Sequence, residues 1–321
     1  MTWLAGKRIY IAGHRGLAGS ALLRAAQARG LAPLITHTHA EVDLEHPTQT
    51  QRMFEADRPE VVFLAAAKVG GILANNSYPV DFLLRNLLIE ANVIRAAHAA
   101  GVQRLLFLGS SCIYPRDAEV PVKEASLLTG PLEATNRPYA LAKIAGIELC
   151  WAFNRQHGTR FLAAMPTNLY GRGDSYDPHN SHVFPALIRK VHEAKAAGRD
   201  EVVLWGSGKP RREFLSADDL ADALLFLAGL DNARFAALTD PVHCPLINVG
   251  TGVDLEVREL AQLIAEVIGW RGRFVHDTSK PDGTMRKVMD VSRLAALGWS
   301  SRISLRDGIA TAYEDFLAHH V

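Results

Sequence analysis

The stretch RIYIAGHRGLAG, residues 8–19, decides the predicted fold. It begins as a short apolar strand, and glycines follow at positions 13, 16 and 19 where the pattern becomes helical. Glycines at this spacing allow a tight turn and a close approach of the backbone to a diphosphate, which the N-terminus of the next helix then faces. Glycines are common in turns, so the surrounding sequence has to support a dinucleotide site.

Short apolar runs and helical segments alternate through the first half of the chain. Such runs are typical of buried strands in a parallel sheet that helices cover on both faces. We therefore predict an α/β fold, a doubly wound parallel-sheet Rossmann domain with a smaller interleaved C-terminal substrate lobe. The predicted strands lie at 8–13, 32–36, 59–67, 104–110 and 160–166, and the predicted helices include 17–29, 80–100 and 136–157.

The pattern changes after Pro166, which predicts the second lobe. The further helices are expected at 184–198, 217–230 and 255–269, and the further strands at 201–205 and 245–250. We place the Rossmann domain at 1–175, with 215–250 returning to it, and the substrate lobe at 176–214 and 251–321. The helix at 80–100 is apolar around most of its circumference, which favours a homodimer that covers its outer face.

The composition excludes several classes of partner. The 35 Lys and Arg nearly balance the 34 Asp and Glu, so no strong net charge attracts nucleic acid or an anionic membrane. We find no signal-peptide pattern and no apolar run that spans a bilayer, and we expect a cytoplasmic protein. Cys112, Cys150 and Cys244 are too widely spaced for a disulfide framework or a paired-cysteine zinc site, and the histidines show no metal-ligand spacing.

Charges near the glycine turn favour NADP over NAD. The second strand runs into Thr36, His37, Thr38 and His39, without the acid that binds the ribose of NAD. Arg15, inside the turn, provides a cation for a 2′-phosphate, although it could also be an ordinary solvated arginine.

Tyr139 and Lys143 form a YxxxK pair, one turn apart on a predicted helix. A nearby ammonium lowers the pKa of a tyrosine, and lysine can also hold a nicotinamide ribose. Ser110 and Ser111, at the end of an earlier strand, offer a hydroxyl that shares a substrate oxygen with Tyr139. YxxxK pairs also arise by chance on helices, but together with a dinucleotide these groups suffice for hydride transfer at a carbonyl.

These motifs carry a family resemblance. The glycine turn, YxxxK and PTNLYG (166–171) resemble the extended short-chain dehydrogenase/reductases that act on nucleotide sugars. LGSSCIYP (108–115), NSHVFPAL (180–187), WGSGKPRREFL (205–215) and SKPDGTMRK (279–287) resemble the GDP-L-fucose synthases more closely, and the similarity extends over about residues 7–315. This resemblance implies epimerisation of GDP-4-keto-6-deoxy-D-mannose at C3 and C5, followed by reduction at C4 with NADPH to GDP-L-fucose.

The resemblance also implies catalytic roles. Tyr139, Lys143 and Ser110 would stabilise the enolate oxygen during epimerisation and deliver a proton during reduction. Cys112 would be the base and His182 the acid, on opposite faces of the sugar. The residues alone favour a small buried hydrophobe for Cys112 and a surface or structural histidine for His182.

The implied binding residues fall into a cofactor set and a substrate set. The cofactor set is Gly13, His14, Arg15, Gly16, Leu17, Gly19, His39, Asp43, Leu44, Leu108, Gly109, Ser110, Ser111, Lys143, Pro166, Thr167, Asn168, Leu169 and His182, where Asp43 could equally be a loop cap. The substrate set is Lys190, Trp205, Arg212, Arg273 and Asp282.

Two departures from the family pattern matter. Lys190 stands where the family usually has an arginine, which keeps the charge but loses the planar fork. His37 and His39 stand where the family commonly has arginines, so we expect a weaker or more pH-dependent preference for NADPH.

Two other interpretations stay open. A nucleotide-sugar 4-epimerase or a GDP-mannose 3,5-epimerase of the same fold would regenerate its cofactor within each turnover. A redox sensor would keep the dinucleotide fold as a binding module without catalysis. The combined presence of serine, tyrosine, lysine, cysteine and histidine argues against the sensor, and net consumption of NADPH would exclude the recycling enzymes.

Overall fold

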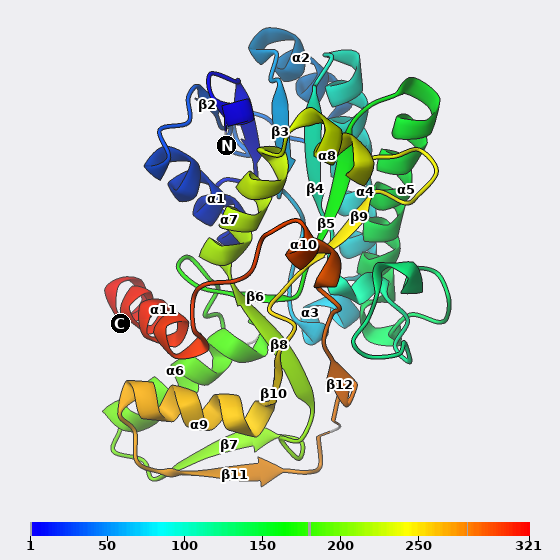
Figure 1. The fold of residues 1–321 in the computed structure, drawn as a ribbon. Coiled ribbons are helices and arrows are strands. Elements are labelled where there is room, and N and C mark those ends of the chain that lie inside the picture. The colour runs from blue at the N-terminus through cyan, green and yellow to red at the C-terminus, as the bar shows by residue number, and fades with distance from the viewer. Residues whose placement is uncertain (1, 179–180, 281) are drawn as a thin grey trace.

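The computed structural model describes residues 2–178, 181–280 and 282–321. A parallel six-stranded sheet, in the order β2-β1-β3-β4-β5-β9, forms the centre of the larger lobe (Figure 1). Its strands are Ile9–Ala12 (β1), Leu34–Ile35 (β2), Val61–Leu64 (β3), Arg104–Leu108 (β4), Phe161–Pro166 (β5) and Leu246–Val249 (β9). The predicted doubly wound α/β fold is therefore confirmed. β2 is shorter than predicted, since Pro33 has no N–H group for the ladder.

Helices cover both faces of this sheet. α1 (Leu17–Ala28) and α7 (Ala217–Ala228) pack together on one face, and α2 (Pro47–Asp57), α4 (Pro79–Ala99) and α5 (Arg137–His157) cover the other. Side chains alternate between the two cores along each strand, so Ile9 and Ile11 join one and Tyr10 and Ala12 the other.

The strand order reverses direction between β1 and β3, because β2 lies on one side of β1 and β3 lies on the other. In doubly wound sheets, ligands bind at such a switch point, outside the carboxyl ends of the strands. The glycine turn begins here, since Gly13 directly follows β1 with a φ of 82° and Gly16 is the N-cap of α1.

The smaller lobe has its own hydrophobic core. Its strands are Asn168–Tyr170 (β6), Arg211–Ser216 (β8), Asp254–Glu256 (β10) and Arg286–Lys287 (β12) in one sheet, and Glu201–Trp205 (β7) and Arg273–Asp277 (β11) in a parallel pair. Helices α6 (Val183–Ala196), α9 (Val257–Ile268) and α11 (Leu305–His320) pack in this core (Figure 1).

The chain passes between the lobes more than once. After β8 it returns to the larger lobe, where α7 packs on α1 and β9 pairs with β5. The domain boundaries given above remain a prediction. The shorter elements are α3 (Ile72–Ser77), α8 (Asn232–Leu238), α10 (Ser292–Ala296) and the 3-10 turns η1 (Thr2–Leu4), η2 (Ser111–Ile113), η3 (Glu124–Ser126) and η4 (Ala134–Asn136).

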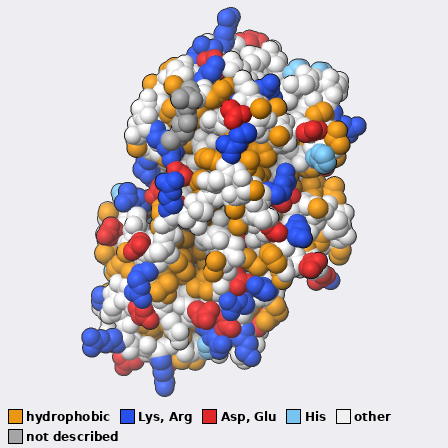
Figure 2. Space-filling view, in the orientation of Figure 1, with side chains coloured by type: hydrophobic (Ala, Val, Ile, Leu, Met, Phe, Trp, Pro, Cys, Tyr) orange, Lys and Arg blue, Asp and Glu red, His pale blue; other side chains and the backbone are white. Residues whose placement is uncertain are grey.

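Charged side chains of both signs are interspersed over the face of the molecule shown in Figure 2. Within the described ranges, no helix is long and apolar enough to cross a membrane. Nor does this part of the chain bring together three or more His, Cys, Asp or Glu side chains that could hold a metal ion.

Candidate active site

Two glycines of the turn, Gly13 and Gly19, have no room for a side chain. A Cβ atom at Gly19 would lie 2.1 Å from the carbonyl oxygen of Gly13, and one at Gly13 would lie 2.7 Å from the backbone of Ala66. The Gly16 N–H donates to the Gly13 carbonyl over 3.0 Å, so α1 begins directly at the switch point with its free N–H groups beside it. In the described structure the buried Nδ1 of His14 has no hydrogen-bond partner, as expected of a group that meets a bound ligand. The turn therefore fits a dinucleotide.

Arg15 is exposed on this turn and has an acidic neighbour. The Glu41 carboxylate accepts hydrogen bonds from the Thr38 N–H and hydroxyl over 2.7 and 2.8 Å. These bonds hold its pKa below the usual value, and His37 and Arg15 act weakly in the same direction. The charge around Arg15 is therefore mixed, which reduces its attraction for a phosphate.

The two histidines that follow β2 also face acids. His37 Nε2 lies 2.6 Å from Asp57 Oδ2 on α2, and His39 Nδ1 lies 3.6 Å from Asp43 Oδ1. The carboxylate of Asp43 accepts the N–H of Glu45 over 2.9 Å, so Asp43 does act as a loop cap. His39 is the more exposed histidine and is therefore the more available to a ligand.

The other predicted cofactor residues of β4 and β5 lie at the carboxyl ends of these neighbouring strands. Leu108 ends β4, and a Cβ atom at Gly109 would lie 1.8 Å from the Met165 side chain. Pro166 ends β5, and the side chains of Thr167 and Asn168 both donate to the Glu213 carbonyl, over 3.2 and 2.8 Å. Leu44 and Ser111 are buried, and Leu17 and Leu169 pack against the core on the α1 side.

Ser110, Cys112 and Tyr139 form one electrostatically coupled group. Ser110 is the N-cap of η2, and its Oγ accepts the Cys112 N–H over 3.4 Å. Burial raises the pKa of the Cys112 thiol, against the opposing effects of Lys287 and Lys143. Burial also raises the pKa of Tyr139 well above 10, and Cys112 adds to that rise. Cys112 does not lie on a strand, because β4 ends at Leu108 and the chain turns at Ser110.

Lys143 lies beneath this group in a buried ion pair. Its ammonium nitrogen is 3.0 Å from the Glu90 carboxylate of α4, and the two side chains are 1% and 2% exposed. The same nitrogen lies 4.6 Å from the ring centre of Phe107 and 5.8 Å from that of Tyr139.

His182 is the N-cap residue of α6 and belongs to the smaller lobe. Its side chain is solvent-accessible, yet the surrounding protein disfavours the imidazolium and lowers its pKa. Among the described residues, no hydrogen bond or ring contact joins His182 to Cys112. The structure therefore brings together four of the five predicted catalytic residues, and the pairing of His182 with Cys112 stays a prediction.

Trp205 ends β7 with 67% of its surface exposed. The ammonium nitrogens of Lys190 and Lys280 lie 5.3 and 5.7 Å from its ring centre. Ser207, in the loop after β7, donates its N–H and its hydroxyl to the Asp282 carboxylate, over 2.8 and 2.7 Å. Three of the five predicted substrate residues therefore lie in one region of the smaller lobe.

Arg212 and Lys287 face each other across paired strands, β8 and β12. One Nη of Arg212 donates to the carbonyl oxygens of Arg211 and Thr284 over 2.8 and 2.6 Å. These bonds occupy some of the guanidinium N–H groups that could otherwise bind a phosphate. Burial lowers the pKa of both Arg212 and Lys287, and Lys287 also interacts electrostatically with Cys112. Lys280 therefore lies beside Trp205, and Lys287 lies within electrostatic range of Cys112.

Arg273 does not join this group. It forms an exposed ion pair with Glu201, at the end of the β7–β11 pair opposite Trp205. Four residues of extended chain, about 13 Å, separate the two positions.

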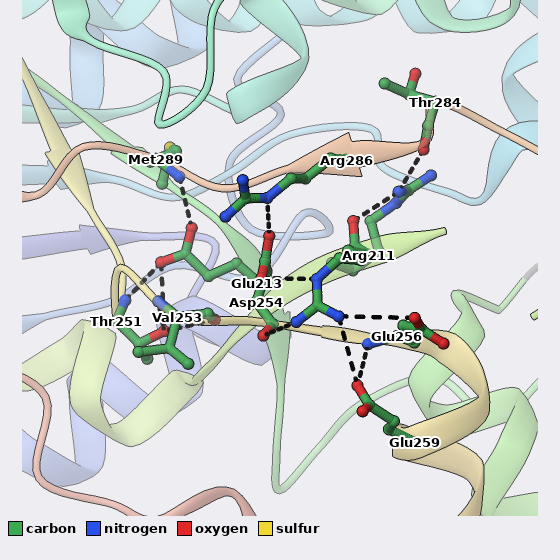
Figure 3. Close-up of polar contacts among 11 residues, drawn as sticks. Arg211, Glu213, Thr251, Val253, Asp254, Glu256, Glu259, Thr284, Arg286 and Met289 are labelled. Carbon is green, nitrogen blue, oxygen red and sulfur yellow. Dashed lines mark hydrogen bonds and ion pairs between the residues drawn. The ribbon is translucent and has the colours of Figure 1, made fainter. Parts of the chain in front are cut away.

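A network of polar groups around Glu213 and Asp254 holds residues 284–289 against β8 (Figure 3). Glu213 is fully buried, and its carboxylate accepts the N–H groups of Thr251, Gly252 and Met289 over 2.6, 2.8 and 2.9 Å. The Asp254 carboxylate also binds the guanidinium groups of Arg211 and Arg286. These contacts fix the backbone on which Lys287 stands.

The sequence-based prediction missed three charged residues of this region. Glu90 could have been noticed as an acid inside an apolar helix, NLLIEANVI (86–94). Lys287 and Glu213 give no local signal of their own, because their positions depend on the pairing of β8 with β12, which joins distant segments.

Comparisons with known proteins agree with this geometry. The sequence model of the NAD dependent epimerase/dehydratase family matches residues 9–234. The GDP-L-fucose synthase of Escherichia coli (strain K12) is 52% identical over 314 residues, covering 98% of each chain. That of Sinorhizobium fredii (strain NBRC 101917 / NGR234) is 47% identical over 319 residues, covering 99% of this chain and 98% of its own.

A solved structure resembles the whole molecule. The GDP-L-fucose synthetase from Naegleria fowleri bound to NADP superposes with a TM-score of 0.86 at 25% identity, covering 98% of this chain and 95% of its own. The chain therefore belongs to the NAD dependent epimerase/dehydratase family, and within it to the GDP-L-fucose synthases.

Proposed function

We propose that this protein converts GDP-4-keto-6-deoxy-D-mannose to GDP-L-fucose, by epimerisation at C3 and C5 and reduction at C4 with NADPH. The observation that carries the proposal is the grouping of Ser110, Cys112, Tyr139 and Lys143 beyond β4, two strands from the glycine turn. Relatives named for this activity align with almost the entire chain.

NADPH would bind along the carboxyl ends of the strands. The glycine turn and the N-terminus of α1 would hold its diphosphate, and Arg15 with His39 would hold its 2′-phosphate. The backbone at 166–169 would lie near the nicotinamide, and Lys143 would hold the nicotinamide ribose. When bound, this cofactor supplies the hydride for C4.

Epimerisation uses the 4-keto group. This carbonyl acidifies the hydrogens on C3 and C5, and hydrogen bonds from Ser110 and Tyr139 would stabilise the enolate oxygen that forms. Cys112 would remove a proton from one face of the ring, and His182 would return one to the other. Burial raises the pKa of Cys112, and partial desolvation by the surrounding protein lowers that of His182, which favours the neutral forms of both. Loss of the Cys112 proton to solvent and gain of a solvent proton by His182 would create the thiolate base and the imidazolium acid, so the proton returned to the ring would come from solvent.

Reduction requires a proton donor at the C4 oxygen. The raised pKa of Tyr139 keeps it a phenol at neutral pH, which is the form that donates. As the C4 oxygen gains charge, Tyr139 would transfer its proton, and the Lys143 ammonium would stabilise the phenolate left behind.

The proposed site would offer each part of a GDP-sugar a suitable group. Trp205 and its two lysines offer a flat apolar surface and cations to the nucleoside end. Arg212 and Lys287 would face the diphosphate, and Cys112 would face the sugar.

We also propose a homodimer formed through α4 and α5. Val80, Leu84 and Leu88 follow one another at helical spacing on the outer face of α4, and Leu141 lies on the neighbouring α5. All four are exposed, with 68%, 51%, 37% and 40% of their surfaces accessible. An apolar face of this kind is typical of a subunit interface.

A cytoplasmic location is supported by the cysteines. Cys112, Cys150 and Cys244 are all free thiols, as is usual in a reducing compartment.

The stoichiometry of NADPH oxidation tests the proposed activity. With GDP-4-keto-6-deoxy-D-mannose in limiting amount, we expect one NADPH to be oxidised per sugar. A recycling epimerase would change the sugar without net oxidation, and a redox sensor would bind NADPH but leave the sugar unchanged. Either result would overturn the proposal.

A further inference from the structure

The ion pair between Glu90 and Lys143 lies between two helices and the sheet. Glu90 extends from α4 and Lys143 from α5, the two helices that pack together on this face. Both side chains are almost completely buried. Buried ion pairs of this kind rarely stabilise a protein more than apolar side chains of the same size would. A role in function therefore explains this buried pair better than a gain in stability does.

Gly146 provides the space that the Glu90 carboxylate occupies. It stands three residues after Lys143, on the same face of α5. A Cβ atom at Gly146 would lie 2.8 Å from Glu90 Oε2 and 2.5 Å from the Phe107 ring. The backbone of α5 therefore fixes the carboxylate beneath the lysine, and the Phe107 ring lies against both.

We propose that Glu90 is a positioning residue for the reaction, whose carboxylate holds the Lys143 ammonium charged and fixed between the rings of Phe107 and Tyr139. From this place the ammonium serves the nicotinamide ribose and the tyrosine phenol. The inference rests on the proposed function, because it assigns to Lys143 the role described there. Glu90 itself touches neither substrate nor cofactor in this scheme.

The charges around the pair are few. Glu90 interacts electrostatically with Lys143, Tyr139 and Cys150, all on α5. Cys112 of η2 faces Tyr139, and Lys287 of β12 lies behind Cys112. Burial raises the pKa of Glu90, and the Lys143 ammonium opposes that rise. Glu90 is therefore the main source of negative charge for the ammonium.

Removing this carboxylate should shift the pH dependence of reduction in one direction. Without its counter-ion, the buried ammonium loses its proton at a lower pH. Reduction needs the ammonium beside Tyr139, so activity should be lost at lower pH than in the wild type.

The test compares Glu90→Gln, which keeps the shape, with Glu90→Asp, which keeps the charge. Glu148→Gln, on α5 like Lys143, is the control. The measured quantity is kcat for NADPH oxidation from pH 6 to 10. In Glu90→Gln we expect kcat to fall on the alkaline side of the profile at a pH about one unit lower than in the wild type, or lower still. Glu148→Gln should match the wild type. An unchanged alkaline fall in folded Glu90→Gln would overturn the proposal.

Glu90→Asp keeps the proposal testable if Glu90→Gln does not fold. Its shorter side chain keeps the ammonium charged but holds it less firmly. The alkaline fall in kcat should therefore stay within about 0.3 pH units of the wild type, while the Kd for NADPH should rise severalfold. Wild-type Kd and kcat in this variant would contradict the positioning role.

NADPH binding separates this inference from the proposed activity. Fluorescence titration of NADPH from pH 6 to 9 needs no sugar, and the Kd of Glu90→Gln should rise with pH more steeply than that of the wild type. If the wild type binds NADPH but oxidises none with the keto-sugar, the proposed activity fails while this titration still tests Glu90. Parallel Kd curves for the two proteins would overturn the inference.

Discussion

At the scale of single residues, the proposed reaction depends on groups whose charged forms the protein disfavours. Burial raises the pKa of Cys112 and Tyr139, and partial desolvation by the surrounding protein lowers that of His182. The cysteine and histidine are therefore neutral before the sugar binds, and the tyrosine is a proton donor. These states suit a proton relay better than attack by a cysteine nucleophile, which needs a lowered thiol pKa.

Cys112→Ser tests the base role. A hydroxyl is a much weaker base than a thiolate, so exchange of the C3 and C5 hydrogens with solvent should slow by at least about a hundredfold. The Kd for NADPH should stay within about twofold of the wild type, because the variant keeps the size of the side chain. Cys244→Ser controls for loss of a thiol elsewhere. Exchange at the wild-type rate in Cys112→Ser would exclude Cys112 as the base.

His39→Arg tests the origin of cofactor preference. Histidine loses its charge between pH 5 and 8, so the wild-type NADPH/NADH ratio of kcat/KM should be higher at pH 6 than at pH 8. An arginine keeps its charge, and the ratio of the variant should be higher and flat. A strong preference that is flat with pH in the wild type would contradict this role of His39.

Asp174→Asn tests a pH effect on stability. Burial, with Asp315 nearby, raises the pKa of Asp174 to about 7. The unfolded carboxyl titrates near pH 4, so the free energy of unfolding falls as pH rises from about 4 to 7. The amide does not titrate, and the variant should gain about 4 kcal/mol at pH 8 but only about 1 kcal/mol at pH 4.5. Urea unfolding at both pH values measures this; equal gains at both would show that charge is not the cause.

At the scale of elements, apolar strands were predictable and contact-dependent elements were not. The runs that form β1, β3, β4 and β5 are continuous and buried, so their pattern is unambiguous. Helix α2 buries only Thr50, Met53 and Phe54, and its polar sequence gave no clear period. β12 has two residues and exists because it pairs with β8.

Gly146→Ala tests the close packing of α5 on α4. Alanine is normally favoured over glycine within a helix, by about 1 kcal/mol. Here the new methyl group meets Glu90 and Phe107, so we expect destabilisation by about 1–3 kcal/mol and reduced kcat. Thermal unfolding and NADPH oxidation measure the two effects. A variant of equal or higher stability would show that the helices adjust without cost.

At the scale of the whole molecule, the proposed site requires both lobes. The glycine turn and the YxxxK pair could be predicted from local patterns within the larger lobe. The approach of Lys287 to Cys112 could not, because it depends on how β12 pairs with β8 and how the lobes pack. The resemblance supplied His182 as a candidate, and its place at the start of α6 shows no bond to Cys112.

Leu84→Glu together with Leu88→Glu tests the proposed dimer. Two carboxylates on the outer face of α4 would be buried without partners in the interface. We expect the wild type to be a dimer and the variant a monomer in light scattering, with unchanged secondary structure. Leu317→Glu, on the exposed part of α11, is the matched control. A monomeric wild type, or a variant that stays dimeric, would contradict the interface.

The central claim is that one site performs both epimerisation and reduction. The most direct measurement is to incubate the protein with GDP-4-keto-6-deoxy-D-mannose and NADPH in heavy water and locate deuterium in the product. The account predicts solvent deuterium at both C3 and C5, together with oxidation of NADPH. Oxidation without deuterium at these carbons would show a simple 4-reductase and would contradict it.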